Sequence, residues 1–311
     1  MKVGIKLRKN DLAWKPYIEE LKKISDVDVL YDGKLAPLYP EIDVLITTNI
    51  SENILDRFPK LKRIFLPKTG MDELPLKKLK EKGIEVHPSH ANADVIAEHA
   101  LALSLALLHR IPEFDKDLRD GYWYSNGNNY TWKSISDLQI GILGYGNIGK
   151  SLHQKLSGFK NEVYAYNQSG IYQSGAVGVR SITELVIKSD LIFVCLPKTI
   201  KTKDIFNQEI LQKMKGKYLV NIGRAEVCSE KALYEALETG VLAGYASDVW
   251  CLKPDKMNKL KKSKPSNFPF ENLKNVIMSP HCATHEINAH ERYIRDSVES
   301  CKKYIRSRES I

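Results

Sequence analysis

The chain of 311 residues contains few cysteines and no long hydrophobic run. Its five cysteines are scattered, and no two have the C-x-x-C spacing of a metal or redox motif, so we expect a reduced protein of the cytoplasm. The longest apolar stretch, residues 100–108, is much shorter than the roughly 18 residues of a membrane span. No signal-peptide pattern precedes the first expected strand, so we also expect no membrane partner.

Negative charge is in deficit, because 47 Lys and Arg residues stand against 38 Asp and Glu residues and the formal net charge is +9. An excess of positive charge suits either nucleic acid or a small anionic substrate and cofactor. The lysines are spread along the faces of expected helices rather than gathered in one patch. We therefore favour small anions and expect no nucleic-acid partner.

Short apolar strands and amphipathic helices alternate along the whole chain, which predicts a parallel α/β fold. We expect strands at residues 2–7, 27–31, 44–48, 61–66, 84–87, 138–143, 162–166, 191–196, 218–222, 242–249 and 276–278. We expect helices at residues 17–24, 54–58, 74–82, 147–156, 208–214, 229–238 and 287–305. One further helix, residues 93–108, is apolar on all sides and should be buried.

Two polar stretches interrupt this alternation. Residues 122–132 are rich in Tyr and Trp, which favours a packing arm at a homodimer contact over a ligand site. Residues 253–264 are rich in lysine, and we favour a solvated surface loop there over an anion-binding lid.

The sequence Gly144-Tyr145-Gly146-Asn147-Ile148-Gly149 has the G-x-G-x-x-G spacing of a dinucleotide-binding loop. The first glycine permits a sharp turn, the second lets a pyrophosphate approach the backbone, and the third lets the helix pack on the sheet. The expected strand before the motif, the helix after it and the strand ending at Tyr166 form a βαβ unit of the right length. The motif, including Asn147 and Ile148 at the helix N-terminus, therefore predicts a bound dinucleotide.

Several motifs occur in order at other expected strand ends and helix starts. They are Asn92 to His99, Gly121 to Trp123, Leu196-Pro197-Lys198-Thr199, Asn221 to Arg224, Asp248-Val249 and Ser279-Pro280-His281. With the glycine motif, they give the chain a resemblance to the D-isomer-specific 2-hydroxyacid dehydrogenase family over nearly its whole length. The resemblance implies two Rossmann-like doubly wound parallel-sheet domains with a cleft between them. Residues 1–93, completed by a C-terminal helix in 285–311, would form the substrate domain, and residues 94–284 the dinucleotide-binding domain.

The resemblance also implies an oxidoreductase that transfers a hydride between NAD(P)H and a small 2-keto acid or D-2-hydroxy acid of the glyoxylate or hydroxypyruvate type. Arg224 matches the arginine that clamps the substrate carboxylate and carbonyl, although a structural ion pair is the alternative for this residue. His281 matches the catalytic histidine that supplies the proton. The remaining substrate residues implied are Lys68, Thr69, Gly70 and Asn92. We expect no metal, because His285, Glu286 and His290 lack the H-E-x-x-H spacing.

Further cofactor contacts are implied at the strand ends, namely at Asn167, Gln168, Ser169, Pro197, Thr202, Ile222 and Asp248. NAD-preferring members of the family have an acidic residue at the position of Asn167, where it accepts the ribose hydroxyls and repels a 2′-phosphate. Asn167-Gln168-Ser169 removes that repulsion and offers hydrogen-bond donors. We therefore favour NADP over NAD.

Lys253 is a departure from the family pattern, which usually has a glutamate there that pairs with the catalytic histidine. A nearby cation would lower the pKa of that histidine instead. Either Lys253 points away, another carboxylate such as Glu286 takes over, or proton transfer is impaired. The last possibility leaves two alternatives: an NAD(P)-binding sensor with little catalysis, or a formate dehydrogenase-like enzyme, which needs no proton transfer.

Overall fold

A computed structural model of the chain describes residues 1–7, 11–32, 34–123, 130–170, 172, 175–254 and 262–309. The chain divides into two compact units. Unit 1 comprises Met1–Asn92 and Glu286–Ile311, and unit 2 comprises Ala93–His285. The expected domain limits, 93/94 and 284/285, each differ from these by one residue. The cleft expected between the domains stays a prediction.

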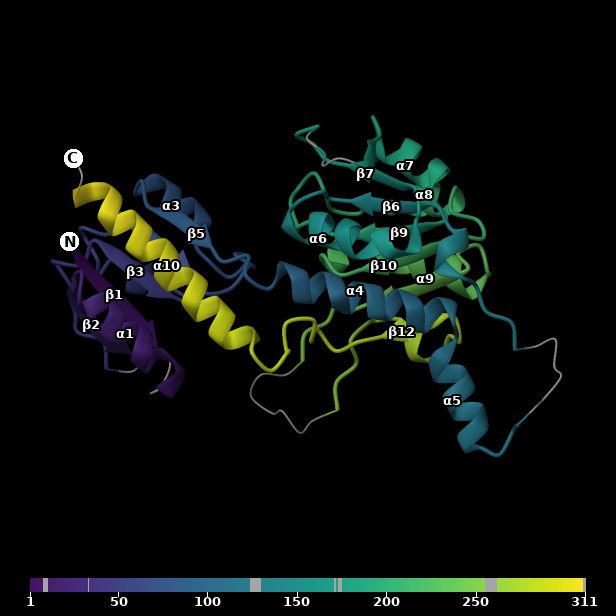
Figure 1. Ribbon diagram of the computed structural model, residues 1–311, viewed down its shortest axis with the longest axis horizontal. Helices are drawn as coiled ribbons and strands as arrows, with labels where there is room; N and C mark the ends of the chain where they lie inside the picture. Colours follow the sequence, from purple (N-terminus) through teal and green to yellow (C-terminus); the bar gives the residue numbers. More distant parts are fainter. Residues whose placement is uncertain are drawn as a thin grey trace. The chain divides into compact units, whose positions relative to one another are not determined.

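Unit 1 contains a parallel sheet of five strands in the order β2-β1-β3-β4-β5 (Figure 1). The strands are β1 (Lys2–Leu7), β2 (Asp26–Tyr31), β3 (Val44–Thr47), β4 (Arg63–Leu66) and β5 (Glu85–Pro88). The helices are α1 (Lys15–Lys22), α2 (Glu52–Leu55), α3 (Leu76–Glu81) and α10 (Ala289–Glu309). The 3₁₀ turn η1 (Leu12–Trp14) comes directly before α1.

Alternating side chains of unit 1 face two separate cores, as the period of two in a strand requires. Val44 and Ile46 of β3 pack in one core with Ile294 and Val298 of α10. Leu45 of the same strand packs in the other core, with apolar residues of α2 and α3. Helices therefore cover both faces of this sheet, as in a doubly wound fold.

Unit 2 contains a parallel sheet of seven strands in the order β12-β11-β10-β9-β6-β7-β8. The strands are β6 (Ile140–Leu143), β7 (Val163–Tyr166), β8 (Ala176–Gly178), β9 (Leu191–Val194), β10 (Tyr218–Asn221), β11 (Gly244–Ser247) and β12 (Val276–Met278). The helices are α4 (Ala93–Leu108), α5 (Ile111–Arg119), α6 (Asn147–Leu156), α7 (Ile182–Lys188), α8 (Gln208–Gln212) and α9 (Glu230–Glu238). The 3₁₀ turns are η2 (Ile135–Asp137), η3 (Ser157–Phe159), η4 (Ala225–Val227) and η5 (Phe270–Asn272).

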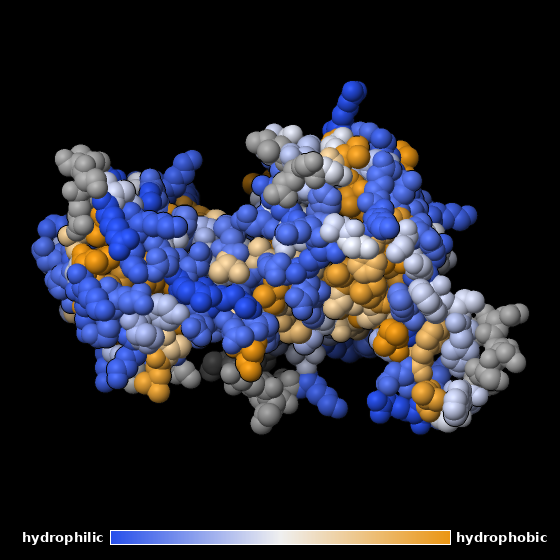
Figure 2. Space-filling model, viewed as in Figure 1, coloured by the Kyte–Doolittle hydropathy of each residue, from blue (hydrophilic) through white to orange (hydrophobic). Residues whose placement is uncertain are grey.

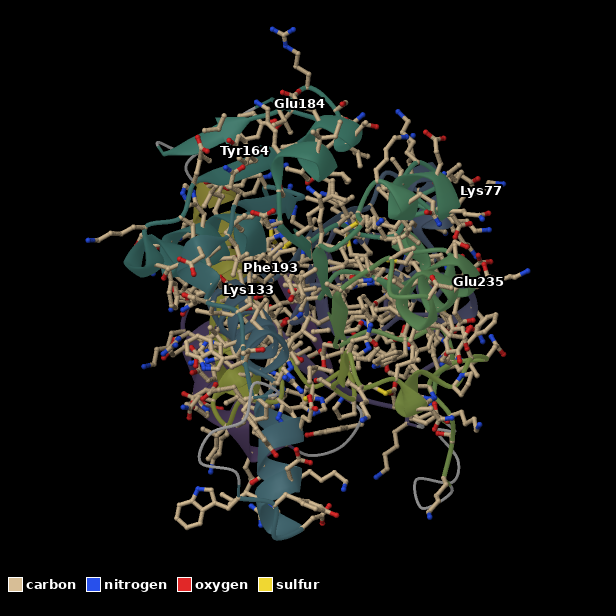
Figure 3. All side chains as sticks on the ribbon, turned by 90° about the vertical axis from the view of Figure 1, so that its right-hand side faces the viewer. Lys77, Lys133, Tyr164, Glu184, Phe193 and Glu235 are labelled. Carbon is tan, nitrogen blue, oxygen red and sulfur yellow. The ribbon has the colours of Figure 1, made fainter. Side chains whose placement is uncertain are left out.

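The same alternation builds the core of unit 2. Phe193 of β9 packs with α4 and α6 on one face of the sheet, whereas Ile192 and Val194 pack with α7, α8 and α9 on the other. Phe193 is fully buried at the centre of this unit in Figure 3, while the acidic side chain of Glu184 lies at its margin. The α/β class and the doubly wound parallel sheets expected from the sequence are thus confirmed.

Three elements of unit 2 were not expected from the sequence. They are α5, α7 and the short, largely exposed strand β8. Pro112 lies in the first turn of α5, where a missing N–H costs no hydrogen bond. Parts of the two polar stretches, residues 124–129 and 255–261, lie outside the described residues, so neither the homodimer arm nor the lysine-rich loop is tested.

The surface in the view of Figure 2 is mostly hydrophilic, with scattered apolar groups. Ile200, for example, is 99% exposed. All five cysteines are free. No single helix of the described chain has the length and apolarity to span a membrane, and the pair α4 and α5 passes that test only jointly, across a bend of 57°.

Candidate active site

The carboxyl ends of the strands in unit 2 collect most of the predicted site residues along one edge of the sheet. Because all strands of this sheet run parallel, the segments after β6, β7, β9, β10, β11 and β12 leave it on the same side. The chain order reverses between β6 and β9, which are neighbours in the sheet. Ligands of doubly wound sheets bind at such a switch point, beside the strand ends.

The glycine motif follows β6 at this switch point, and its three glycines meet three different conditions. Gly144 has a φ of +100°, and a Cβ there would lie 3.0 Å from backbone atoms of Cys195 at the end of β9. A Cβ on Gly149 would lie 2.4 Å from the carbonyl oxygen of Gly144. A Cβ on Gly146 would meet no protein atom within 4 Å. The first and third glycines are therefore required by close packing within the protein, whereas the protein leaves open space beside the second.

The start of α6 offers what a dinucleotide pyrophosphate needs. Gly146 is the N-cap residue, and no side chain caps the helix. Gly146 and Asn147 are both exposed. The first N–H groups of this helix and the positive end of its dipole are therefore directed at an anion beside the open face of Gly146. The residues present fit the dinucleotide that the motif predicts.

Asn167 follows β7 at the same edge and organises the turn predicted to hold the adenosine ribose. Its Oδ1 accepts a hydrogen bond of 3.4 Å from the backbone N–H of Ser169, and its Nδ2 donates one of 3.4 Å to the carbonyl of Tyr145. The hydroxyl of Tyr172 lies 3.1 Å from the Asn167 backbone nitrogen, which donates to it. Gln168 and Ser169 are exposed. The turn is thus tied to the glycine loop and carries no negative charge.

Two predicted cofactor residues have local structural roles in this structure. The hydroxyl of Thr202 donates to the Pro197 carbonyl at 2.7 Å and accepts a bond of 2.7 Å from the backbone N–H of Thr199. It therefore closes the turn after β9. Ile222 is only 6% exposed and belongs to the core beneath α4 and α6. Any cofactor contact of these residues stays a prediction.

Arg224 follows β10 and is held by a turn that the side chain of Asn221 organises. Asn221 is fully buried, donates from Nδ2 to the Arg224 carbonyl at 3.0 Å and accepts from the Gly223 N–H at 3.0 Å. A Cβ on Gly223 would lie 2.5 Å from the carbonyl oxygen of Leu196, so only glycine fits there. The guanidinium of Arg224 donates to the Gly223 carbonyl at 2.7 Å, and the residue is only partly buried. The sequence identified Arg224 but missed Asn221, whose place in the Asn-x-x-Arg motif was the available signal.

Asp248 follows β11 and anchors the loop after β12. Its side chain is 2% exposed, and its carboxylate accepts hydrogen bonds from the Ser279 hydroxyl and from the N–H groups of Cys282, at 2.8 Å, and Ala283, at 2.9 Å. Burial alone would raise the pKa of Asp248, but hydrogen bonds from His99, Ser279 and these two N–H groups outweigh burial and lower the pKa to about 2. The observed role of Asp248 is therefore to hold the loop as an anion, and the predicted contact with the nicotinamide stays a prediction.

His281 lies in the middle of this loop, between the anchored residues. It is exposed and has a φ of +58°, in the left-handed region that side chains with a Cβ seldom occupy. Within the described part of the chain its ring has no hydrogen bond or ion pair. The imidazole is thus exposed at the loop after β12.

The structure answers part of the question that Lys253 raised. Lys253 is exposed and forms no ion pair with another described residue. Glu286, which the sequence offered as a substitute carboxylate, instead contacts the Arg292 guanidinium and accepts from the backbone N–H of Asn288 at 3.0 Å. The suggestion that Glu286 takes over stays a prediction.

The predicted carboxylate loop of unit 1 follows β4. The hydroxyl of Thr69 donates to the Ser89 carbonyl at 2.9 Å and contacts the hydroxyl of Tyr293 at 3.3 Å. Lys68 pairs with Glu73 at 3.4 Å. Within the described residues, the N–H groups of Thr69 and Gly70 donate to no protein acceptor, so they are available to an anion.

Asn92, predicted to bind substrate, has a different role. It is fully buried, its Nδ2 donates to the Ala289 carbonyl at 2.9 Å, and its Oδ1 accepts from Nε of Arg292 at 3.0 Å. Its side chain thus fastens the end of the first segment of unit 1 to α10. The substrate contact predicted for Asn92 stays a prediction.

Comparison with known proteins agrees with this arrangement. Residues 101–283 match the sequence model described as "D-isomer specific 2-hydroxyacid dehydrogenase, NAD binding domain". A glyoxylate reductase of Thermofilum pendens is 32% identical over 288 residues, covering 90% of this chain and 79% of the relative. A hydroxypyruvate reductase of Thermotoga maritima is 29% identical over 290 residues, covering 92% of this chain and 91% of the relative.

A solved structure gives the same result. The D-lactate dehydrogenase of Aquifex aeolicus, complexed with NAD and lactic acid, superposes with a TM-score of 0.77 at 25% identity and covers 98% of this chain and 96% of that one. The resemblance stated from the sequence motifs is confirmed. The chain belongs to the D-isomer specific 2-hydroxyacid dehydrogenase family and is an NAD(P)-dependent oxidoreductase of that family.

Proposed function

We infer that this enzyme reduces a small 2-keto acid of the glyoxylate or hydroxypyruvate type, in a reversible reaction, and that NADPH is its preferred reductant. One observation carries the proposal. Arg224 and the loop of His281 leave the sheet after β10 and β12, on the edge where the glycine motif follows β6. The relatives named glyoxylate reductase and hydroxypyruvate reductase support this substrate class.

Each residue has a chemical task in this reaction. A hydride moves between the nicotinamide ring and the carbonyl carbon of the keto acid, which is the chemistry that the cofactor contributes. The planar guanidinium of Arg224 binds the substrate carboxylate and polarises the carbonyl. Negative charge that develops on the carbonyl oxygen is neutralised by a proton from the imidazole of His281.

The substrate proposal is tested by following NADPH absorbance with a panel of 2-keto acids. We expect turnover with glyoxylate or hydroxypyruvate, and a loss of at least about a hundredfold in kcat/KM for Arg224→Ala, because an electrostatic clamp is removed. Arg224→Lys keeps the positive charge but not the planar guanidinium, so its kcat/KM should lie between those of the wild type and Arg224→Ala. Lys231→Ala, on the exposed face of α9, is the control for loss of a distant positive charge. A mild loss in Arg224→Ala would show that another residue holds the substrate.

The cofactor proposal depends on the neutral turn at Asn167. An aspartate there would repel a 2′-phosphate, so Asn167→Asp should shift the ratio of kcat/KM for NADPH over NADH by at least about tenfold toward NADH. Asn167→Ser, which stays neutral, is the matched control. A wild-type enzyme with a strong preference for NADH would contradict the proposal.

A second candidate function is favoured by one observation. Lys253 stands where the family usually has a glutamate, and His281 has no carboxylate partner among the described residues. An NAD(P)-binding sensor with impaired proton transfer is therefore the alternative. Tight NADPH binding without turnover of any keto acid, or of formate with NADP⁺, would favour the sensor.

A further inference from the structure

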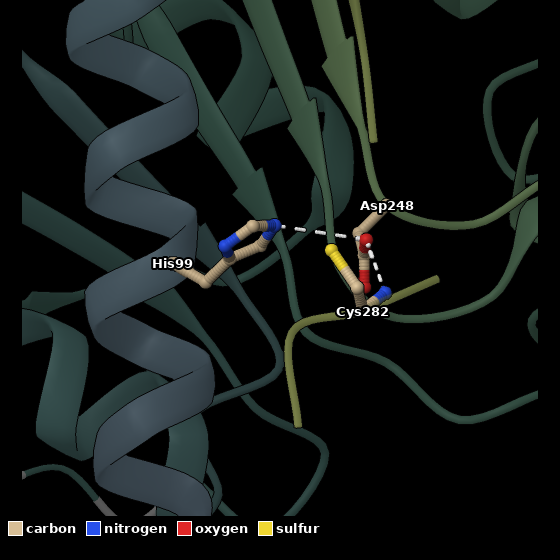
Figure 4. A group of neighbouring side chains, drawn as sticks. All are labelled: His99, Asp248 and Cys282. Carbon is tan, nitrogen blue, oxygen red and sulfur yellow. Dashed lines mark hydrogen bonds and ion pairs between the residues drawn. The ribbon is translucent and has the colours of Figure 1, made fainter. Parts of the chain in front are cut away.

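A histidine from a different part of unit 2 completes the anchor of the His281 loop. His99 lies on α4, 180 residues before Ser279 in sequence, and its Nε2 lies 2.9 Å from the Ser279 hydroxyl. The same nitrogen lies 3.6 Å from Oδ1 of Asp248. Figure 4 shows the His99 ring directed from the helix toward Asp248 and Cys282.

Ser279 has every polar group occupied by a partner. Its N–H donates to the Ser247 carbonyl at 2.9 Å, and its carbonyl accepts from the indole N–H of Trp250 at 2.8 Å. Its hydroxyl donates to Asp248, so the hydroxyl proton is already committed. Nε2 of His99 must therefore carry the proton and donate it to the Ser279 oxygen.

This arrangement is a hydrogen-bond network rather than a metal site. His99, Asp248 and Cys282 each bring one potential ligand atom within 4.8 Å of the others. The Ser279 hydroxyl, however, contacts all three, at 2.9 Å from His99 and 3.3 Å from the Cys282 sulfur, with Asp248 as its acceptor. The hydroxyl thus occupies the place among these atoms that an ion would need.

The anchor encloses the strained residue from both sides. Ser279 precedes His281 by two residues, and the N–H groups of Cys282 and Ala283, directly after it, donate to Asp248. A non-glycine residue in the left-handed region is strained and persists only where the surroundings fix it. The φ of +58° at His281 is therefore maintained by bonds on its two flanks.

We propose that His99 is a positioning residue, which fixes the His281 loop through Ser279 and Asp248 and so sets the place from which His281 delivers its proton. The inference rests on the proposed function, which makes His281 the proton donor. Misplacement of a reacting group by about 1 Å can cost about a hundredfold in rate. Loss of the His99 donor should therefore slow chemistry without weakening cofactor binding.

The test compares His99→Leu, which removes the donor at similar size, with His99→Gln, whose side-chain amide can still donate. Ser279→Ala and Ser279→Thr form a second pair that removes or keeps the linking hydroxyl. His109→Leu is the control, because His109 follows the same helix but stacks on Trp132 at 4.1 Å. For each variant, kcat, the KM values, the NADPH dissociation constant and the primary isotope effect with deuterated NADPH are measured.

We expect His99→Leu and Ser279→Ala to lower kcat about tenfold to a hundredfold, with unchanged NADPH affinity and a larger isotope effect. His99→Gln and Ser279→Thr should recover most of the loss, and His109→Leu should match the wild type. Activity should also survive treatment with a metal chelator.

Three results would overturn the inference: a wild-type kcat in both deletion variants, a loss that merely follows the folded fraction with an unchanged isotope effect, or equal losses in the conservative and deletion variants. Loss of activity on chelation would overturn the network and favour a metal. Wild-type protein without turnover, or His281→Ala with the wild-type kcat, would instead refute the proposed function, and the inference with it.

Discussion

Replacement of Asp248 by asparagine probes the anchor of the His281 loop through protein stability. The pKa of Asp248 is lowered from 3.8 to about 2. A shift of this size corresponds to about 2 kcal/mol in favour of the folded state once the group is ionised. In asparagine, an NH₂ group replaces one carboxylate oxygen and cannot accept a hydrogen bond. A donor such as the Ala283 N–H would then lose its acceptor. We expect Asp248→Asn to lower the free energy of unfolding at pH 7 by about 3 kcal/mol.

The pH dependence follows from the direction of the shift. Because the folded pKa lies below the unfolded one, the stabilisation is fully present above about pH 4 and is lost as the pH falls toward about 2. About 1 kcal/mol of it should be gone at pH 3. Asparagine does not titrate, so the difference between wild type and Asp248→Asn should shrink by that amount between pH 7 and pH 3.

Urea unfolding of both proteins across this pH range measures the difference directly. Asp115→Asn is the control, because Asp115 lies exposed on α5 and pairs with Arg119 one turn away. Such exposed pairs contribute little to stability, because solvent and salt screen them. If the difference between wild type and Asp248→Asn stays constant from pH 7 to pH 3, the carboxylate of Asp248 does not stabilise the fold by being ionised.

Three further substitutions test contacts elsewhere. Gly223→Ala should cost about 1–3 kcal/mol of stability and most of the activity, because its Cβ would lie 2.5 Å from the Leu196 carbonyl oxygen. The control is Gly158→Ala, whose Cβ meets no atom within 4 Å and which should be tolerated. Thermal unfolding and activity assays compare the two variants. Lys217→Met should lower the urea midpoint by an amount equivalent to about 1.5–3 kcal/mol, because the Lys217 ammonium donates to three carbonyls at the C-terminal end of α7. An unchanged midpoint would show that these hydrogen bonds have no net effect on stability. Asn92→Ala should destabilise unit 1 by about 1–3 kcal/mol, because two hydrogen bonds to the α10 segment are lost, and should leave KM for the keto acid unchanged. A large rise in KM would show that Asn92 binds the substrate.

The sequence predicted the framework of the molecule because the framework depends on local patterns. The strand at Ile140–Leu143, the glycines after it and the helix from Asn147 lie within twenty residues and show their periods directly. The helix α5 was not expected from the sequence, although a proline at position 112 is compatible with the first turn of a helix. The three-residue strand β8 is too short and too exposed to leave a periodic signal.

Sequence motifs mark the candidate reactive residues, whereas the contacts that support these residues could not be predicted. Arg224 and His281 follow strands, and motifs mark them. Ser279, Cys282 and Ala283, which donate to Asp248, are 31 to 35 residues away from it. The contact of His99 with Ser279 spans 180 residues. Asn92 belongs to a motif that suggests substrate binding, whereas tertiary packing uses its amide to fasten α10. Contacts across such separations leave no periodic trace in one sequence.

The discontinuity of unit 1 has a consequence for biosynthesis. Val3 and Ile5 of the first strand complete their core only with Ile294, Val298 and other residues of α10. Unit 2 is a continuous segment and has its own two cores, so it can fold as soon as it has left the ribosome. In residues 1–92, η1 and α1 cover this face of the sheet in part, and α10 completes the cover. The core of unit 1 is therefore completed after the segment of unit 2 has been synthesised, and the strands of unit 1 are the part that a chaperone would need to protect.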